Sequence, residues 1–178
     1  INNWDKVSGY DLTGKVVVVT GPTSGLGKEC VRILAPTGAQ LVLVARNKGK
    51  CEDVISSVRT LCTGPEPVCV IAEMGDLASV GKAAREIAVR FPQVLALVHN
   101  AGALLNSREV SPQGIEQTIS SHVLGPHLLT TVLLPNLIAT QGRVVTVSSG
   151  GMYSAELPNI DGKRTLEMRV DSYNGSKQ

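Results

Sequence analysis

The chain has 178 residues and a formal net charge of +2; hydrophobic residues make up 43% of it and charged residues 18%. This balance excludes a disordered chain, and it provides no basic field of the kind that binds nucleic acid. No apolar run is long enough to cross a bilayer as a helix. Aromatic residues account for only 3%, so we expect a core of Val, Leu, Ile and Ala.

Four cysteines, at positions 30, 51, 62 and 69, form no CxxC pair and have no group of His partners. This pattern argues against a zinc site, and we expect no metal. Cys30 and Cys69 lie within apolar runs, so we interpret them as small core residues. Free thiols fit a reducing compartment, and the cytoplasm is the default expectation where the sequence leaves the compartment unknown.

Apolar runs alternate with helix-like segments along the chain. Strands are predicted at 15–20, 40–45, 68–72, 94–98 and 143–147. Helices are predicted at 28–35, 49–61, 79–90 and 111 to about 140. Buried strands that alternate with helices indicate an α/β fold with a doubly wound parallel sheet, the Rossmann fold. We expect residues 1–178 to form a single dinucleotide-binding domain.

Helix boundaries carry their own signals. Ser79 is a plausible N-cap for the third helix, and Ser111-Pro112 would open the long fourth helix. Gly125-Pro126 is expected to kink that helix. Residues 150–171 have no clear periodicity and are predicted to be a loop or lid.

A glycine-rich turn follows the first predicted strand and precedes the first helix. It reads TGPTSGLG over residues 20–27. Glycines allow the backbone to approach a phosphate, and the next helix offers free N–H groups at its start. The spacing differs from GxGxxG, and the alternative is an ordinary tight turn. The candidate cofactor-binding residues here are Gly21, Thr23, Ser24, Gly25, Leu26 and Gly27.

Four motifs occur in the order that is typical of one family. They are the TGxxxGxG turn, the HNAG sequence at 99–102, the serines at 148–149, and the YxxxK sequence at 173–177. Together they resemble the short-chain dehydrogenase/reductase family over essentially the whole chain. The long interval between Ser149 and Tyr173 resembles the retinol-dehydrogenase-like branch. The stretches 106–114 and 143–152 look most like dehydrogenase/reductase family member 12.

The resemblance implies seven strands, of which five are predicted here. The chain begins with Ile1 and ends one residue after Lys177, so we expect it to be part of a longer protein with an incomplete C-terminal end. It also implies a homodimer, because family members often assemble through the long helix.

Tyr173 and Lys177 are four residues apart, so on a helix they would share one face. An ammonium close to a phenol favours the phenolate, which suits Tyr173 to exchange a proton with a carbonyl oxygen. The resemblance implies that Lys177 also binds the nicotinamide ribose and that Ser149 orients the carbonyl, with Ser148 as the alternative. The plain alternatives are an exposed helix face for Tyr173 and Lys177, and strand-end capping for the two serines.

The end of the second strand indicates the cofactor. Residues 45–48 read ARNK, with no acid to bind the ribose hydroxyls of NAD. Arg46 could clamp a 2′-phosphate, which predicts NADP(H); the alternative is an ordinary exposed charge. Asp76-Leu77 resembles the family's adenine-contacting pair, although Asp76 could merely cap a helix. The resemblance also places Asn100, Ala101 and Gly102 at the cofactor.

Two histidines depart from the family pattern. His122 stands where many members have an Asn that helps to complete a proton relay. A histidine could bridge a water there, could disrupt the relay, or could be an unremarkable side chain. His99 replaces the first Asn of NNAG, so a hydrogen bond at the sheet edge is in doubt.

These observations predict an NADP(H)-dependent oxidoreductase that interconverts an alcohol and a ketone or aldehyde. Its partner would be a small carbonyl or alcohol substrate, which the retinol-type resemblance suggests is bulky and apolar. The alternative is a non-catalytic NADP(H)-binding module, or an inactive paralogue with a sensing or scaffold role. His122 and the short C-terminal end favour that alternative.

Overall fold

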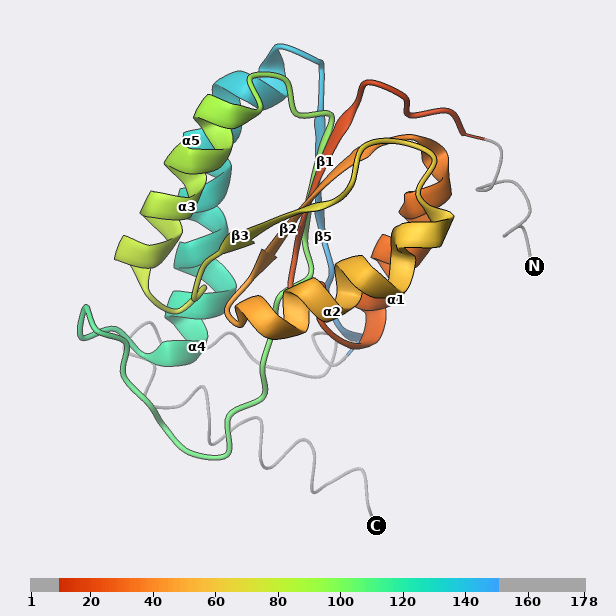
Figure 1. The fold of residues 1–178 in the computed structure, drawn as a ribbon. Coiled ribbons are helices and arrows are strands. Elements are labelled where there is room, and N and C mark those ends of the chain that lie inside the picture. Colours follow the sequence, from red (N-terminus) through yellow and green to blue (C-terminus); the bar gives the residue numbers. More distant parts are fainter. Residues whose placement is uncertain (1–9, 151–178) are drawn as a thin grey trace.

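The computed structural model describes residues 10–150, which form a five-stranded parallel sheet flanked by helices (Figure 1). The strand order is β3-β2-β1-β4-β5. This arrangement confirms the predicted doubly wound fold, because the chain moves outward from β1 in both directions. The strands are β1 (Val16–Thr20), β2 (Gln40–Ala45), β3 (Val68–Ile71), β4 (Ala96–His99) and β5 (Arg143–Thr146).

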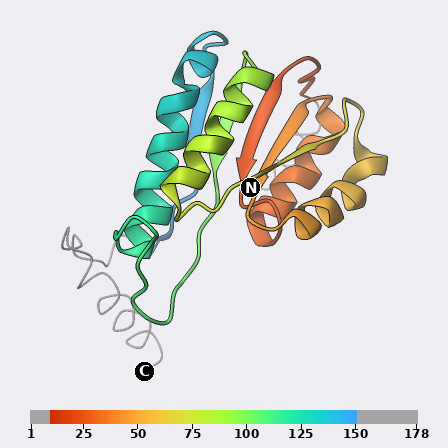
Figure 2. The same cartoon turned by 60° about the vertical axis from the view of Figure 1, so that its left-hand side comes forward.

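Helices cover both faces of the sheet, as Figure 2 shows. One side carries α1 (Gly25–Leu34) and α2 (Lys48–Val58), and the other carries α3 (Leu77–Arg90) and α5 (Gly125–Ile138). Short 3-10 turns, η2 (Ala35–Thr37) and η3 (Arg59–Leu61), follow α1 and α2.

Alternation along the central strands divides the core into two clusters. Val17 and Val19 face α1 and α2, whereas Val18 faces α3 and α5. All three side chains are buried, which explains why β1 reads as an unbroken run of valines. β5 differs: Val144 and Val145 are almost half exposed, so this edge strand is the least covered in the described part of the chain.

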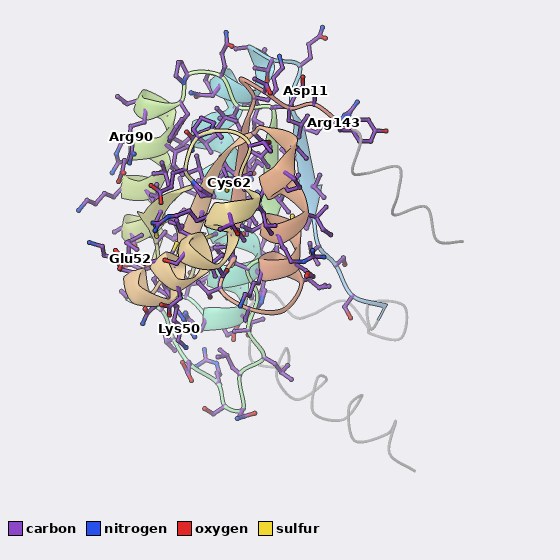
Figure 3. The ribbon with its side chains drawn as sticks, turned by 45° about the vertical axis from the view of Figure 1, so that its right-hand side comes forward. Asp11, Lys50, Glu52, Cys62, Arg90 and Arg143 are labelled. Carbon is purple, nitrogen blue, oxygen red and sulfur yellow. The ribbon has the colours of Figure 1, made fainter. Side chains whose placement is uncertain are left out.

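The cysteines lie in or against the core, and charged side chains lie on the outer surface of α2. Cys51 is fully buried, and Cys30 and Cys69 are half-buried against the core cluster beside α1 and α2. Figure 3 shows charged side chains such as Lys50 and Glu52 on the outer surface of α2. Within residues 10–150, no helix has both the length and the apolar character that a membrane span requires.

The predicted long helix from 111 to about 140 is wrong at its start. Residues 111–116 form a turn in which Gly114 has φ +76° and Val110 pairs with Glu116 in an antiparallel bridge. Helix α4 (Gln117–Ile119) begins only after this turn, and Glu116 Oε2 caps it by accepting the Ile119 N–H (2.8 Å). The Ser-Pro signal marked a turn, because proline fits the second position of a turn as well as the first position of a helix.

The interruption expected at Gly125-Pro126 is a π-helical turn, η4 (Ser120–Leu124), rather than a simple kink. The Gly125 N–H donates to the Ser120 carbonyl, five residues back. Pro126 has no N–H to continue the α-helical pattern, so the widened turn takes up the mismatch before α5 begins. This turn lies next to the site described below.

Two smaller differences concern element ends. Asp76, not Ser79, is the N-cap of α3, and its side chain accepts the Ala78 N–H (3.0 Å). β4 begins at Ala96 rather than Val94, because the Val94 N–H donates to the Asn136 carbonyl of α5 (3.0 Å).

Candidate functional site

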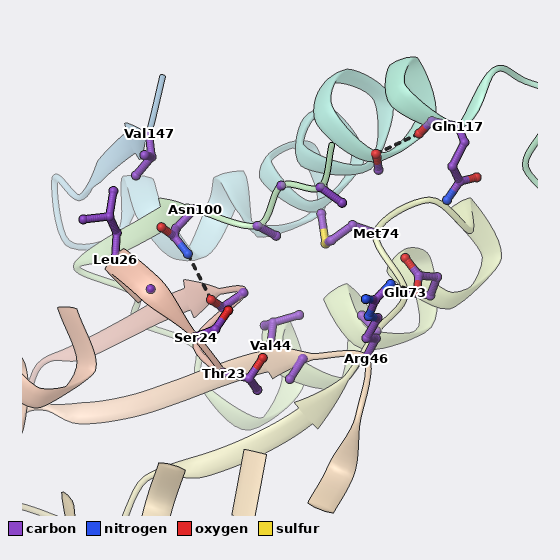
Figure 4. A pocket seen from close by; sticks show the side chains of 18 of the residues that line it. Thr23, Ser24, Leu26, Val44, Arg46, Glu73, Met74, Asn100, Gln117 and Val147 are labelled. Carbon is purple, nitrogen blue, oxygen red and sulfur yellow. Dashed lines mark hydrogen bonds and ion pairs between the residues drawn. The ribbon is translucent and has the colours of Figure 1, made fainter. Parts of the chain in front are cut away.

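A pocket of about 450 Å³ lies at the carboxyl edge of the sheet, where the loops after all five strands meet (Figure 4). It spans the gap between β1 and β4, the point at which the strand order reverses, and ligands of open α/β sheets bind at this position. The structure brings together most of the predicted cofactor-binding residues along its wall: Gly21, Thr23, Ser24, Gly25, Leu26, Arg46, Asn100, Ala101 and Gly102.

Two glycines of the turn stand where a side chain has no room. Gly21 has φ +65°, and a Cβ on it would come within 2.7 Å of the Ala101 Cα. A Cβ on Gly27 would collide with the Gly21 carbonyl oxygen and with the Asn100 amide nitrogen. The turn is thus packed against the loop after β4, which leaves its outer backbone open to the pocket. Gly27 supports the wall from behind and is not itself part of it.

Thr20 and Asn100 join the two loops. Thr20 Oγ1 accepts the backbone N–H groups of Asn100 (3.1 Å) and Ala101 (3.0 Å). The Asn100 side-chain amide donates to the carbonyl oxygens of Thr20 (3.1 Å) and Gly21 (3.0 Å). Asn100 therefore shapes the pocket through the backbone, and Thr20, which the sequence analysis did not single out, is the buried centre of this network.

At the far end of the pocket, Arg46 and Glu73 stand side by side (Figure 4). Arg46 Nη1 lies 3.8 Å from Glu73 Oε2. Asp76 and Leu77 were predicted to lie here, but Glu73 and Met74 line the pocket instead. Asp76 takes the capping role that was its alternative, and its hydrogen bond from the Gln113 side chain (2.8 Å) holds the pKa of its carboxyl below the ordinary value.

His99 closes β4 and points into the space under α5. Its Nε2 hydrogen-bonds with Thr130 Oγ1 (2.7 Å), while Nδ1 is buried and has no hydrogen-bond partner among residues 10–150. Burial lowers the pKa of this histidine, because an imidazolium there would lose its hydration. The sheet-edge hydrogen bond is kept by the backbone, where the His99 carbonyl accepts the Val147 N–H (2.9 Å).

His122 lies in the π-helical turn and contacts the loop that carries Gly102. Its Nε2 accepts the backbone N–H of Ala103 (3.0 Å), so this nitrogen carries no proton. Its Nδ1 is 3.1 Å from the Thr118 carbonyl, which it serves as a donor. The ring is therefore the neutral tautomer that fastens the pocket wall to the helix. Its predicted part in a proton relay stays a prediction.

The predicted reacting groups are described only in part. Ser148 and Ser149 follow β5, are exposed, and lie at the same edge of the sheet as the pocket, although Val147 is the residue of this segment that lines it. Tyr173 and Lys177 lie outside the described residues. Several wall residues were not predicted, chiefly Leu105, Glu109, Gln117 and Ser121, because they come from an irregular loop, from the short helix α4 and from the π-helical turn.

The arrangement suits a long, flat ligand that carries phosphate. The turn at Gly21 and the start of α1 offer backbone donors, and the first turn of α1 contains no acidic residue to repel an anion. Arg46 provides a cation at one end, and apolar Leu105 and Val147 line another part. A dinucleotide combines these features, and the residues present fit one.

Comparison with known proteins agrees with this geometry. The family model for short chain dehydrogenases matches residues 15–157. A short-chain dehydrogenase/reductase of Armillaria gallica is 38% identical over 157 residues, covering 85% of this chain and 50% of the relative. Human dehydrogenase/reductase SDR family member 12 is 31% identical over 151 residues, covering 84% of this chain and 47% of that protein. The chain thus spans about half the length of the curated relatives it matches.

Solved structures show the same likeness. A protein from Escherichia coli CFT073, described as a short-chain dehydrogenase complexed with NADPH, superposes with a TM-score of 0.70. It is 27% identical in sequence, and the superposition covers 94% of this chain and 70% of that one. From the glycine turn, the pocket between β1 and β4 and these matches, it follows that the chain belongs to the short-chain dehydrogenase family.

Proposed function

We propose that the protein containing this chain is an NADP(H)-dependent oxidoreductase that interconverts an alcohol and a ketone or aldehyde. One observation carries the proposal: the pocket between β1 and β4, with its crowded glycine turn, opens on the same sheet edge at which two serines follow the end of β5. A cofactor site and the predicted carbonyl-orienting group therefore share one edge.

The pocket residues would divide the cofactor between them. The backbone of the Gly21 turn and the start of α1 would hold the pyrophosphate. Arg46 would face the adenosine ribose, where a guanidinium favours the 2′-phosphate of NADP. Asn100 and His122 would keep the loop after β4 in place, through the bonds to Gly21 and Ala103. When bound, the nicotinamide supplies or accepts the hydride.

The reaction would be completed by Ser149, Tyr173 and Lys177. In reduction, Ser149 would orient the carbonyl, and the Tyr173 phenol would give its proton to the carbonyl oxygen. The Lys177 ammonium stabilises the phenolate that results. In oxidation, the same phenolate removes the alcohol proton. The resemblance to retinol-type members and the apolar side chains of Leu105 and Val147 support a bulky apolar substrate.

The test uses the intact protein with NADPH and a panel of aliphatic, aromatic and terpenoid aldehydes and ketones. We expect loss of the absorbance of reduced nicotinamide with at least one member of the panel. Tyr173→Phe should lower kcat by about a hundredfold or more while NADPH still binds, which a fluorescence titration would show. Cofactor binding without turnover across the panel, in the wild type, would support a sensing or scaffold role instead.

A further inference from the structure

The cation proposed to meet the 2′-phosphate already has a carboxylate beside it. Arg46 follows β2 and Glu73 follows β3, two parallel neighbours in which Ala45 lies opposite Ile71. Both side chains line the pocket, and Nη1 of the arginine is 3.8 Å from Oε2 of the glutamate (Figure 4). The two charges thus reach the same end of the pocket from adjacent strands.

The glutamate is fixed more firmly than the arginine. Its Oε1 accepts the Gly75 N–H (3.3 Å), and its backbone N–H donates to Ser79 Oγ (3.1 Å). The Asp76 N–H donates to the Glu73 carbonyl, which closes a turn around the residue (3.0 Å). The Arg46 side chain is 76% exposed, and its contact with Glu73 is too long for a hydrogen bond. The guanidinium is therefore freer to turn toward a phosphate than the Glu73 carboxylate, whose side chain is 43% exposed and accepts the Gly75 N–H.

The charges at this end of the pocket come close to cancelling. Arg46 and Glu73 together contribute no net charge, and the next cation along the chain, Lys48, is itself 3.6 Å from Glu52. A phosphate monoester carries about −1.5 to −2 at neutral pH. A bound 2′-phosphate would therefore gain from Arg46 and lose to Glu73, whereas the uncharged 2′-hydroxyl of NAD would meet no repulsion and could donate a hydrogen bond to the carboxylate.

We propose that Glu73 is a specificity-determining residue that limits the preference for NADP(H), so that the protein accepts NAD(H) as well. This inference rests on the proposed function, since it assumes that the adenosine ribose lies beside Arg46. Neutralising Glu73 would then leave the Arg46 charge unopposed. The affinity for a ligand that carries the 2′-phosphate would rise relative to the affinity for one that lacks it.

The experiment compares adenosine 2′,5′-bisphosphate with 5′-AMP, which differ only in the 2′-phosphate, by titration calorimetry on the intact protein. Glu73→Gln keeps an oxygen for the Gly75 N–H and removes the charge. It should bind the bisphosphate about three- to tenfold more tightly, the effect of one charge a few ångströms from a phosphate in a solvated, salt-screened site. Affinity for 5′-AMP should change less than about twofold, and the gain should shrink in about 1 M salt.

Two further variants complete the test. Glu66→Gln is the matched control, because it also removes one carboxylate from an ion pair, the pair with Arg59, which lies outside this pocket. It should leave the affinities for the bisphosphate and for 5′-AMP unchanged. Arg46→Gln should weaken the bisphosphate at least tenfold and spare 5′-AMP. If it does so while Glu73→Gln has no effect, or lowers bisphosphate affinity, the proposal for Glu73 is overturned and the NADP(H) site stands. If Arg46→Gln changes nothing, the NADP(H) assignment itself fails, and the role of Glu73 fails with it.

Discussion

Replacing Thr20 with valine would remove one hydroxyl from the base of the pocket while keeping a side chain of nearly the same shape. Thr20 is 1% exposed. Its Oγ1 accepts the N–H groups of Asn100 and Ala101 and lies 3.3 Å from the Val98 carbonyl, to which it donates. Valine would leave two N–H donors without an acceptor at the point where β4 passes into the pocket wall.

The expected loss follows from these three bonds. A buried donor that loses its acceptor costs about 1–3 kcal/mol, and both N–H groups here are half-buried, so water can replace part of the loss. We expect Thr20→Val to lower the free energy of unfolding by about 2–4 kcal/mol. Thr20→Ser is the matched control, because it keeps the hydroxyl and removes only a methyl group, at a cost of about 1 kcal/mol.

Urea unfolding followed by circular dichroism measures the difference. With a slope of about 1–3 kcal/mol per molar urea, the valine variant should unfold roughly 1–2 M earlier than the wild type and the serine variant about 0.5 M earlier. NADPH affinity should fall further for valine than for serine, since Asn100 and Ala101 line the pocket. Equal midpoints for the two variants would show that the hydroxyl does not hold these loops together.

Three further outcomes follow from burial and close packing. Gly27→Ala should abolish NADPH binding and destabilise the fold by about 2 kcal/mol or more in urea unfolding. Gly49→Ala, whose Cβ would make an ordinary contact with Asn47 Oδ1 at 3.5 Å, should be neutral or stabilising. Burial raises the pKa of the Cys51 thiol, so peptide mapping after alkylation at neutral pH should show Cys62 labelled well before Cys51. Burial lowers the pKa of His99, so as the pH falls the unfolded chain binds a proton before the folded chain does. The urea midpoint should therefore fall as the pH drops from about 7 to 5, and His99→Asn should reduce this pH dependence.

The sheet was predictable because its central strands β1 and β2 are buried on both faces. A strand covered by helices on each side must be apolar along its buried length, and 41–45 reads LVLVA for that reason. The glycine turn was predictable because only glycine tolerates the close approach found at Gly21 and Gly27. The apolar strands follow from burial and the glycine turn follows from backbone geometry. Each leaves a local pattern that can be seen in a single sequence.

The end of the pocket at Arg46 was harder to predict. The acid nearest the family pattern, Asp76, caps a helix, while Glu73 is nearer to the strand end and faces Arg46. Which acid reaches the pocket depends on where β3 stops and how the next turn folds back. Strand ends are the least certain part of any pattern, and an offset of three residues here exchanges a helix cap for a pocket residue.

The segment from Ser111 to Gly125 shows how an irregular backbone can be necessary to a site. Its turn and its π-helical turn both interrupt what the sequence presents as one long helix, yet the second interruption is what brings His122 to the loop after β4. A regular helix would advance each residue by about 100°, and one extra residue in the turn rotates all that follows. Pro126, four residues after His122, has no N–H to donate back along the helix, and this favours the wide turn from which His122 accepts the Ala103 N–H.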